Sequence, residues 1–165
     1  MVSQCASCGH QVDEHDRDVR FRLPDVIAAL PDQEASDGIR MDDPDPNRAD
    51  MIDTKQFGSF FRSLVQVRLS GGYSITYGVW VNVDFDDLGR ALAVWNEPDY
   101  ADLRMTGTLA NAIEPWEVLG SSVTLGVLDV DEMPCVVDSS DDTLRAVVSR
   151  EWDHGPVLSV LSRLH

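Results

Sequence analysis

The sequence predicts an α+β fold: a twisted antiparallel sheet of four to six strands, arranged as a hairpin meander and flanked by two helices. Two observations predict it. Residues 61–69 and 73–83 alternate apolar and polar side chains, which is typical of strands with one buried face. Residues 88–95 and 144–152 instead carry apolar side chains at helical spacing. A small N-terminal extension with a Cys-x-x-Cys motif precedes this domain.

Composition along the chain suggests three segments. The chain of 165 residues has the length of one domain and can bury a substantial core. Residues 1–31 form a small polar lobe that carries Cys and His, and residues 32–50 form an acidic loop that we expect to be mobile or disordered. Residues 51–165 contain the periodic segments and form the main α+β domain.

The elements of the main domain follow one another with recognisable boundaries. Ser70-Gly71-Gly72 separates the two long strands, and glycine favours the tight turn of an antiparallel hairpin. The first helix can be capped by Asp84 or Asp86, and Pro98 lies just beyond its end. The remaining apolar runs predict strands at 104–113, 122–130 and 134–137, before the second helix.

The charge of the chain limits its partners. A formal net charge of −16 repels phosphate backbones, and no basic patch is concentrated in the sequence, so we expect no nucleic-acid binding. The acidic balance suits a basic protein partner. No segment reads as a signal peptide or is apolar enough to span a membrane. Three cysteines, an odd number, argue against a disulfide framework, and we expect a cytoplasmic protein.

The Cys5-x-x-Cys8-Gly9 motif supplies two of the four ligands that a structural zinc site needs. His10 or His15 could supply a third ligand. The fourth would come from a carboxylate, thiol or imidazole elsewhere: Asp13, Asp16, Cys135, His154 or His165. The alternative is an incomplete zinc knuckle with two thiols and no metal, and zinc is the only cofactor that the sequence suggests.

No complete catalytic set is visible in the sequence. The Cys-x-x-Cys motif has no strand before it, unlike the dithiol of thioredoxin-like enzymes. Cys135 could meet His154 as a hydrolytic pair, but it lies in an apolar run typical of inert core cysteines. We therefore expect a non-enzymatic binding or interaction module with an acidic surface. The alternative is a zinc-binding module that uses Cys5, Cys8 and a histidine. If the zinc also serves a catalytic site, the protein is a metal-dependent enzyme.

One face of the predicted hairpin is a candidate partner surface. Trp80 and Asn82 lie on the less apolar side of the second strand, and Arg62 and Arg68 could join them from the first strand. A tryptophan between arginines suits recognition of a ligand or a protein. The alternative is that other segments cover this face, which would make Trp80 part of the core.

The order of these segments resembles an uncharacterised bacterial family of unknown function, DUF2199. The resemblance rests on Cys5 to Gly9, Phe60-Phe61-Arg62, Tyr77-Gly78-Val79-Trp80-Val81 and Gly107-Thr108-Leu109. The family pattern has a further cysteine before the aromatic-arginine strand, where this chain has Asp50-Met51-Ile52-Asp53. The resemblance supports the predicted fold and implies no particular activity.

Overall fold

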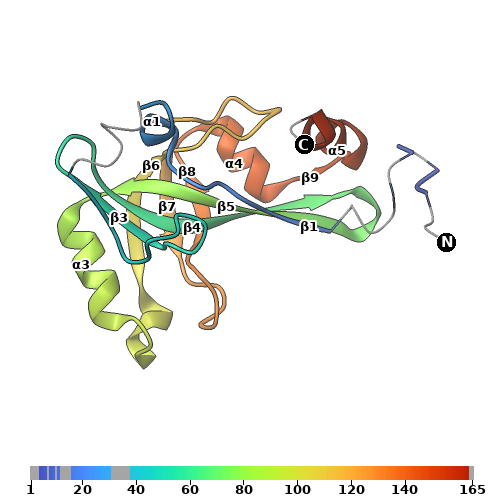
Figure 1. The fold of residues 1–165 in the computed structure, drawn as a ribbon. Helices are drawn as coiled ribbons and strands as arrows, with labels where there is room; N and C mark the ends of the chain where they lie inside the picture. The colour runs from blue at the N-terminus through green and yellow to red at the C-terminus, as the bar shows by residue number, and fades with distance from the viewer. Residues whose placement is uncertain (1–3, 7, 10, 12–15, 31–37, 164–165) are drawn as a thin grey trace.

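The fold was analysed in a computed structural model that describes residues 4–6, 8, 9, 11, 16–30 and 38–163. Figure 1 shows a sheet-dominated molecule with helices packed around it. The strands are β1 (Arg17–Arg20), β2 (Ile39–Met41), β3 (Met51–Thr54), β4 (Gly58–Leu69), β5 (Tyr73–Val83), β6 (Arg104–Leu109), β7 (Ser122–Gly126), β8 (Cys135–Ser139) and β9 (Glu151–Trp152). The helices are α1 (Asp25–Ala28), α3 (Phe85–Val94), α4 (Asp142–Ser149) and α5 (His154–Arg163), with 3₁₀ turns η2 (Ser70–Gly72) and η3 (Pro98–Asp102).

Five of the strands close into a barrel. The β4–β5 hairpin forms as predicted, and β6, β7 and β8 follow it as antiparallel neighbours. Strand β8 then returns to β4 in parallel, where Leu64 pairs with Cys135. The mixed α+β class is confirmed, but the strands form a closed barrel and not the simple twisted antiparallel sheet that we expected. Long twisted strands curl the sheet until its two edges meet, and closure removes edges that would otherwise expose unpaired backbone groups.

The two faces of the hairpin belong to two different cores. The odd-numbered side chains of β4 and β5, such as Phe61 and Val79, lie in the larger core. Across the hairpin, Arg62 pairs with Trp80 and Arg68 with Ser74, so these side chains share the other face. A smaller core covers part of this second face, and it comprises Ile27, Ala49, Ile52, Phe60 and Trp80.

The N-terminal segment and the acidic loop both pack on the barrel. Strand β1 pairs in parallel with β5, and β2 and β3 extend the sheet beyond β4. Residues 38–50 are the described part of the predicted acidic loop, and they include strand β2. A carboxylate oxygen of Asp42 accepts hydrogen bonds from the backbone N–H groups of Asp50 (2.8 Å) and Met51 (3.1 Å). The acidic side chains therefore fold this loop by binding its own backbone.

The end of the chain differs from the predicted single helix over 144–152. Helix α4 begins as expected, with the Asp141 carboxylate accepting from the Leu144 N–H at 3.0 Å. It ends at Ser149 because Glu151 and Trp152 pair with β4 as strand β9, and α5 then begins at His154. Among the described residues, no helix is long and apolar enough to cross a membrane.

Candidate metal centre

Three distant parts of the chain meet at the turn of the β4–β5 hairpin. Figure 1 shows the N-terminal segment, the hairpin tip and α5 at the same end of the molecule. The parallel pairing of β1 with β5 directs the N-terminal segment there, and an Asp16 carboxylate oxygen accepts from the Ser74 N–H at 2.8 Å. On the other side, the pairing of Trp152 with Leu69 brings His154 next to Ser70.

Cys5, Cys8 and His154 form a compact group of two sulfur ligands and one imidazole ligand at this meeting point. Their ligand atoms all lie within 4.8 Å of one another, and Cys5 Sγ is 3.2 Å from His154 Nε2. In a tetrahedral site with zinc–sulfur bonds of 2.3 Å and zinc–nitrogen bonds of about 2.0 Å, ligand atoms lie roughly 3.5–3.8 Å apart. The group could therefore hold a metal ion after small side-chain adjustments.

His154 is oriented for this role by Ser70. The His154 Nδ1 atom lies 2.6 Å from Ser70 Oγ and 3.2 Å from the Ser70 carbonyl oxygen. When Nδ1 carries the ring proton, it donates to Ser70, and the lone pair of Nε2 faces the sulfur of Cys5. Metal-binding histidines are held in this way by a second hydrogen bond on the opposite ring nitrogen. His154 is also buried, with 6% of its surface exposed, so the ring has little freedom to turn away.

The two cysteines are presented on one tight turn. The Gly9 N–H donates to the Cys5 carbonyl at 2.9 Å, and Gly9 has a φ of 76°, which glycine adopts without strain. Cys8 packs against the larger core, and a Cβ atom at Gly155 would lie 3.6 Å from that of Cys8. Both thiols are therefore at the start of α5, where the helix dipole favours negative charge.

The remaining sequence-predicted ligands separate into two groups. Asp16 binds the backbone of Ser74, and Cys135 lies in β8 of the barrel; neither belongs to the described group of three. Four candidates lie outside the described residues: His10, Asp13, His15 and His165. The third ligand that the structure brings to the cysteines is thus His154. The sequence offered it only as one of several distant candidates.

Cys135 is not placed to act as a nucleophile. Its side chain is 2% exposed, and burial, with a smaller contribution from Glu132, raises the pKa of the thiol to about 11. Its sulfur lies 4.0 Å from the Met133 carbonyl oxygen. A thiol that stays protonated and shielded from solvent is inert, as the apolar sequence around it indicates.

Arg62 and Trp80 share a face as predicted, but this part of the face is covered. Both residues are 0% exposed, and the guanidinium carbon of Arg62 lies 3.9 Å from the centre of the Trp80 ring. The Arg62 guanidinium donates to backbone carbonyls from the N-terminal segment, the acidic loop and β5: Phe21, Pro46, Ala49 and Gly78. Burial and the nearby Arg20 lower the pKa of Arg62 to about 9, so it remains charged at neutral pH. Neither residue offers a surface to a partner.

The other two residues of the predicted partner face lie apart from that buried pair. Arg68 is exposed, and it donates to the Ser149 carbonyl at 2.5 Å. Asn82 is half-buried, and its amide donates to the Phe57 carbonyl at 2.9 Å. Each side chain is thus used by a neighbouring segment of its own chain.

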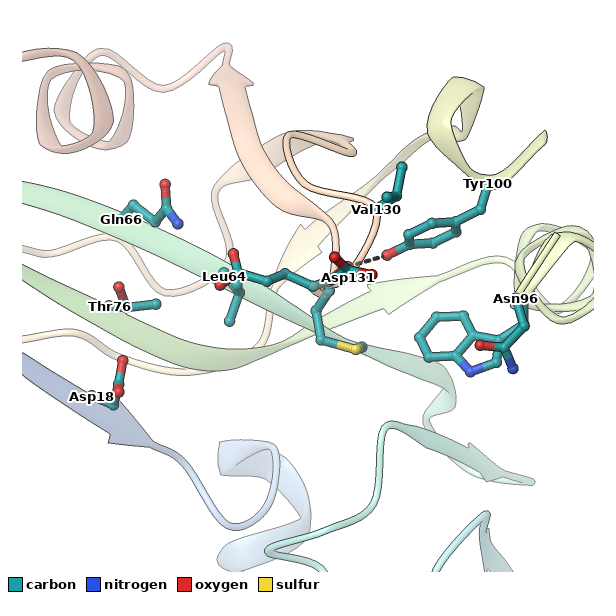
Figure 2. A pocket seen from close by; sticks show the side chains of 11 residues that line it. Asp18, Leu64, Gln66, Thr76, Asn96, Tyr100, Val130 and Asp131 are labelled. Atoms are coloured by element: carbon teal, nitrogen blue, oxygen red, sulfur yellow. Dashed lines mark hydrogen bonds between the residues drawn. The ribbon is translucent and has the colours of Figure 1, made fainter. Parts of the chain in front are cut away.

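A separate pocket of about 480 Å³ lies farther along the same face (Figure 2). Asp18, Thr76 and Gln66 line it side by side from β1, β5 and β4, because their register pairs them across the strands. The Tyr100 hydroxyl donates to the Glu132 carbonyl at 2.6 Å and fixes one wall. The other lining residues are Leu64, Trp95, Asn96, Val130, Asp131 and Met133. The pocket has an acidic rim, but its carboxylates form no metal-binding group among the described residues.

Comparison with known proteins identifies a family but no characterised relative. The family described as an uncharacterized protein conserved in bacteria, DUF2199, matches residues 4–155, which include Cys5, Cys8 and His154. No curated protein matches the chain, and no solved structure matches it.

Proposed function

Since the chain belongs to the uncharacterised bacterial family DUF2199, we propose a function from its own chemistry: it binds one zinc ion through Cys5, Cys8 and His154. The convergence of two thiols and an imidazole from opposite ends of the chain carries this proposal. Thiolate and imidazole ligands together favour zinc over magnesium or calcium, which prefer oxygen. The metal would fasten the N-terminal segment to the hairpin tip and to α5.

A zinc titration tests the proposal. Metal-free protein competes for zinc with a chromophoric chelator, and we expect binding of one zinc per chain. Cys8→Ser and His154→Ala should each weaken the affinity at least about tenfold, because each removes a ligand. Cys135→Ala is the matched control, since it removes the buried cysteine that is outside the group. Equal affinities for all four proteins would contradict the proposal.

The remaining coordination position decides between a structural and a catalytic zinc. Structural zinc takes four protein ligands, whereas catalytic zinc keeps one position for water. His10 and His15 are our candidates for a residue in that position. The same titration on His10→Asn and His15→Asn, and on Asp13→Asn and His165→Asn, identifies such a ligand by its loss of affinity. Retention of full affinity in all four variants would favour the metal-dependent enzyme over the structural module.

We also propose that the acidic pocket recognises a basic partner, as a non-enzymatic interaction module would. Asp18, Asp131 and Glu132 line it beside the half-buried indole of Trp95, and its described lining contains no basic side chain. An arginine-rich peptide should bind in a salt-dependent manner, and Asp131→Asn with Glu132→Gln should weaken it. Binding that is unchanged by this double variant would place the partner elsewhere.

A further inference from the structure

We propose that Cys5 and Cys8 are a site of reversible oxidation, so that a hydroperoxide controls whether the metal is bound. The inference rests on the proposed zinc site and adds its regulation. Both cysteines are reduced and half-buried, and their sulfur atoms lie within 4.8 Å of each other. The turn closed by Gly9 holds them together. Side-chain rotation can therefore bring the two sulfurs to the 2.05 Å of a disulfide bond.

The surroundings of the two sulfurs differ, and this difference sets an order of reaction. Cys5 Sγ lies 3.2 Å from His154 Nε2, and among the described residues Cys5 is not one of those that pack against the larger core. Cys8 packs against the larger core and the start of α5 at Gly155. Cys5 is therefore the sulfur that reacts with the oxidant first, and Cys8 then reacts with the oxidised Cys5 to form the disulfide.

The reaction balances with one hydroperoxide as the oxidant. The Cys5 sulfur attacks one peroxide oxygen, the oxygen–oxygen bond breaks, and the leaving oxygen departs as water after taking up a proton. The Cys8 sulfur then attacks Cys5 Sγ; the sulfur–sulfur bond forms and the hydroxyl of the sulfenic acid leaves as a second water. Two thiolates that were zinc ligands are oxidised, and one hydrogen peroxide takes up two protons from solvent and is reduced to two waters. The disulfide sulfurs no longer act as thiolate ligands, so the zinc ion passes into solution.

Cys135 provides an internal comparison within the same chain. It is fully buried in β8 and shielded from the oxidant, whereas Cys5 and Cys8 are not. The structure therefore predicts oxidation of the N-terminal pair while Cys135 stays reduced.

The test adds hydrogen peroxide to the zinc-loaded full chain and follows zinc with a chromophoric indicator and thiols by mass spectrometry. We expect one zinc released for each pair of thiols lost, with Cys135 still available for alkylation after unfolding. A reductant followed by zinc should restore the starting state. In Cys8→Ser, a sulfenic acid on Cys5 should be trapped by dimedone, and in Cys5→Ser, Cys8 should react at least about tenfold more slowly.

Three results would contradict the inference, each in a distinguishable way. A chain that takes up no zinc fails at the loading step, before peroxide is added, and this contradicts the proposed function as well. A chain that loads zinc but keeps both metal and thiols in peroxide contradicts only the oxidation. Faster reaction of Cys8 than Cys5 contradicts the assigned order.

Discussion

Two of the contacts between the first 50 residues and the barrel work by different chemistry. At one, the buried Arg62 guanidinium binds backbone carbonyls of the N-terminal segment and the acidic loop. At the other, Cys5 and Cys8 meet His154 beside the hairpin turn. The Arg62 contact is complete within the protein, because donor and acceptors are all supplied by the chain. The Cys5–Cys8–His154 contact is a set of ligands that an ion would complete.

The difference shows that one fold can combine a contact made by the chain alone with a contact that depends on a bound metal. Arg62 is 0% exposed, and its charge is stabilised by carbonyl dipoles and the Trp80 ring. The cysteines are half-exposed and can exchange a metal with solvent. We therefore expect Arg62 to govern the stability of the whole fold, and the cluster to govern only the stability that a metal adds.

The largest expected effect comes from Arg62. Arg62→Met should lower the free energy of unfolding by about 3–5 kcal/mol, because several buried carbonyls lose their donor at once. Arg68→Met is the matched control on the same strand and face. Its exposed side chain makes one hydrogen bond to the described residues, so the loss should be about 0.5 kcal/mol. Urea denaturation measures both, and equal losses would contradict the role of Arg62.

Zinc should add stability through the Cys5–Cys8–His154 cluster alone. At a zinc concentration 100-fold above the dissociation constant, the free energy of unfolding should rise by about 2.7 kcal/mol. His154→Ala should lose this increase. Arg62→Lys should keep it on a lower baseline, because Arg62 binds the carbonyls of Pro46 and Ala49, away from the hairpin turn where His154 lies. Thermal unfolding with and without zinc measures the increase. If zinc still raises the stability of His154→Ala by the same amount, the zinc binds at a site other than this cluster.

Ser70 should tune metal affinity without binding the metal. Ser70→Ala removes the hydroxyl 2.6 Å from His154 Nδ1 but leaves the backbone carbonyl at 3.2 Å. We expect zinc affinity to fall about tenfold, the lower end of the range for groups that orient a ligand. Chelator competition measures the change, with Ser74→Ala as the control in the neighbouring strand. An unchanged affinity would show that the carbonyl alone orients the ring.

The smallest effect concerns Tyr77, whose buried hydroxyl has no hydrogen-bond partner among the described residues. Tyr77→Phe should stabilise the protein by about 1 kcal/mol at neutral pH. Burial raises the pKa of Tyr77 to about 12, so above pH 10 only the unfolded chain ionises, and the wild type loses stability as pH rises towards 12. The difference in the free energy of unfolding between Tyr77→Phe and the wild type should therefore be larger by about 1 kcal/mol at pH 11 than at neutral pH.

Tyr100→Phe is the contrasting variant for this measurement. The Tyr100 hydroxyl donates to the Glu132 carbonyl, so its loss should destabilise the protein by about 1 kcal/mol at neutral pH. Denaturation at neutral and alkaline pH compares the two variants. The same sign of change at neutral pH in both would contradict the assignment of Tyr77 as the buried hydroxyl without a partner.

Local periodicity was enough to predict the hairpin, a helix over 88–95 and the beginning of a helix at 144, although the second helix ends at Ser149 and not at Trp152. It could not predict closure of the barrel, because β4 and β8 meet in parallel at Leu64 and Cys135, two positions far apart in sequence. The alternation of β4 correctly assigned Arg62 and Trp80 to one face. It could not show that this face is covered, since the covering segments have little apolar periodicity of their own.

The candidate metal centre was only half predictable for a related reason. Cys5 and Cys8 are close in sequence, so their spacing alone makes them candidate ligands. His154 reaches them through the two-residue strand β9, which is too short to leave a periodic pattern. The nearby His10 and His15 therefore looked the more natural third ligands, and they remain predictions.

X-ray absorption at the zinc edge of the zinc-loaded protein tests the central claim most directly. The account predicts two sulfur neighbours at about 2.3 Å and at least one imidazole nitrogen at about 2.0 Å, with the imidazole signal reduced in His154→Ala. A zinc shell of oxygen and nitrogen alone, or a spectrum unchanged by His154→Ala, would contradict it.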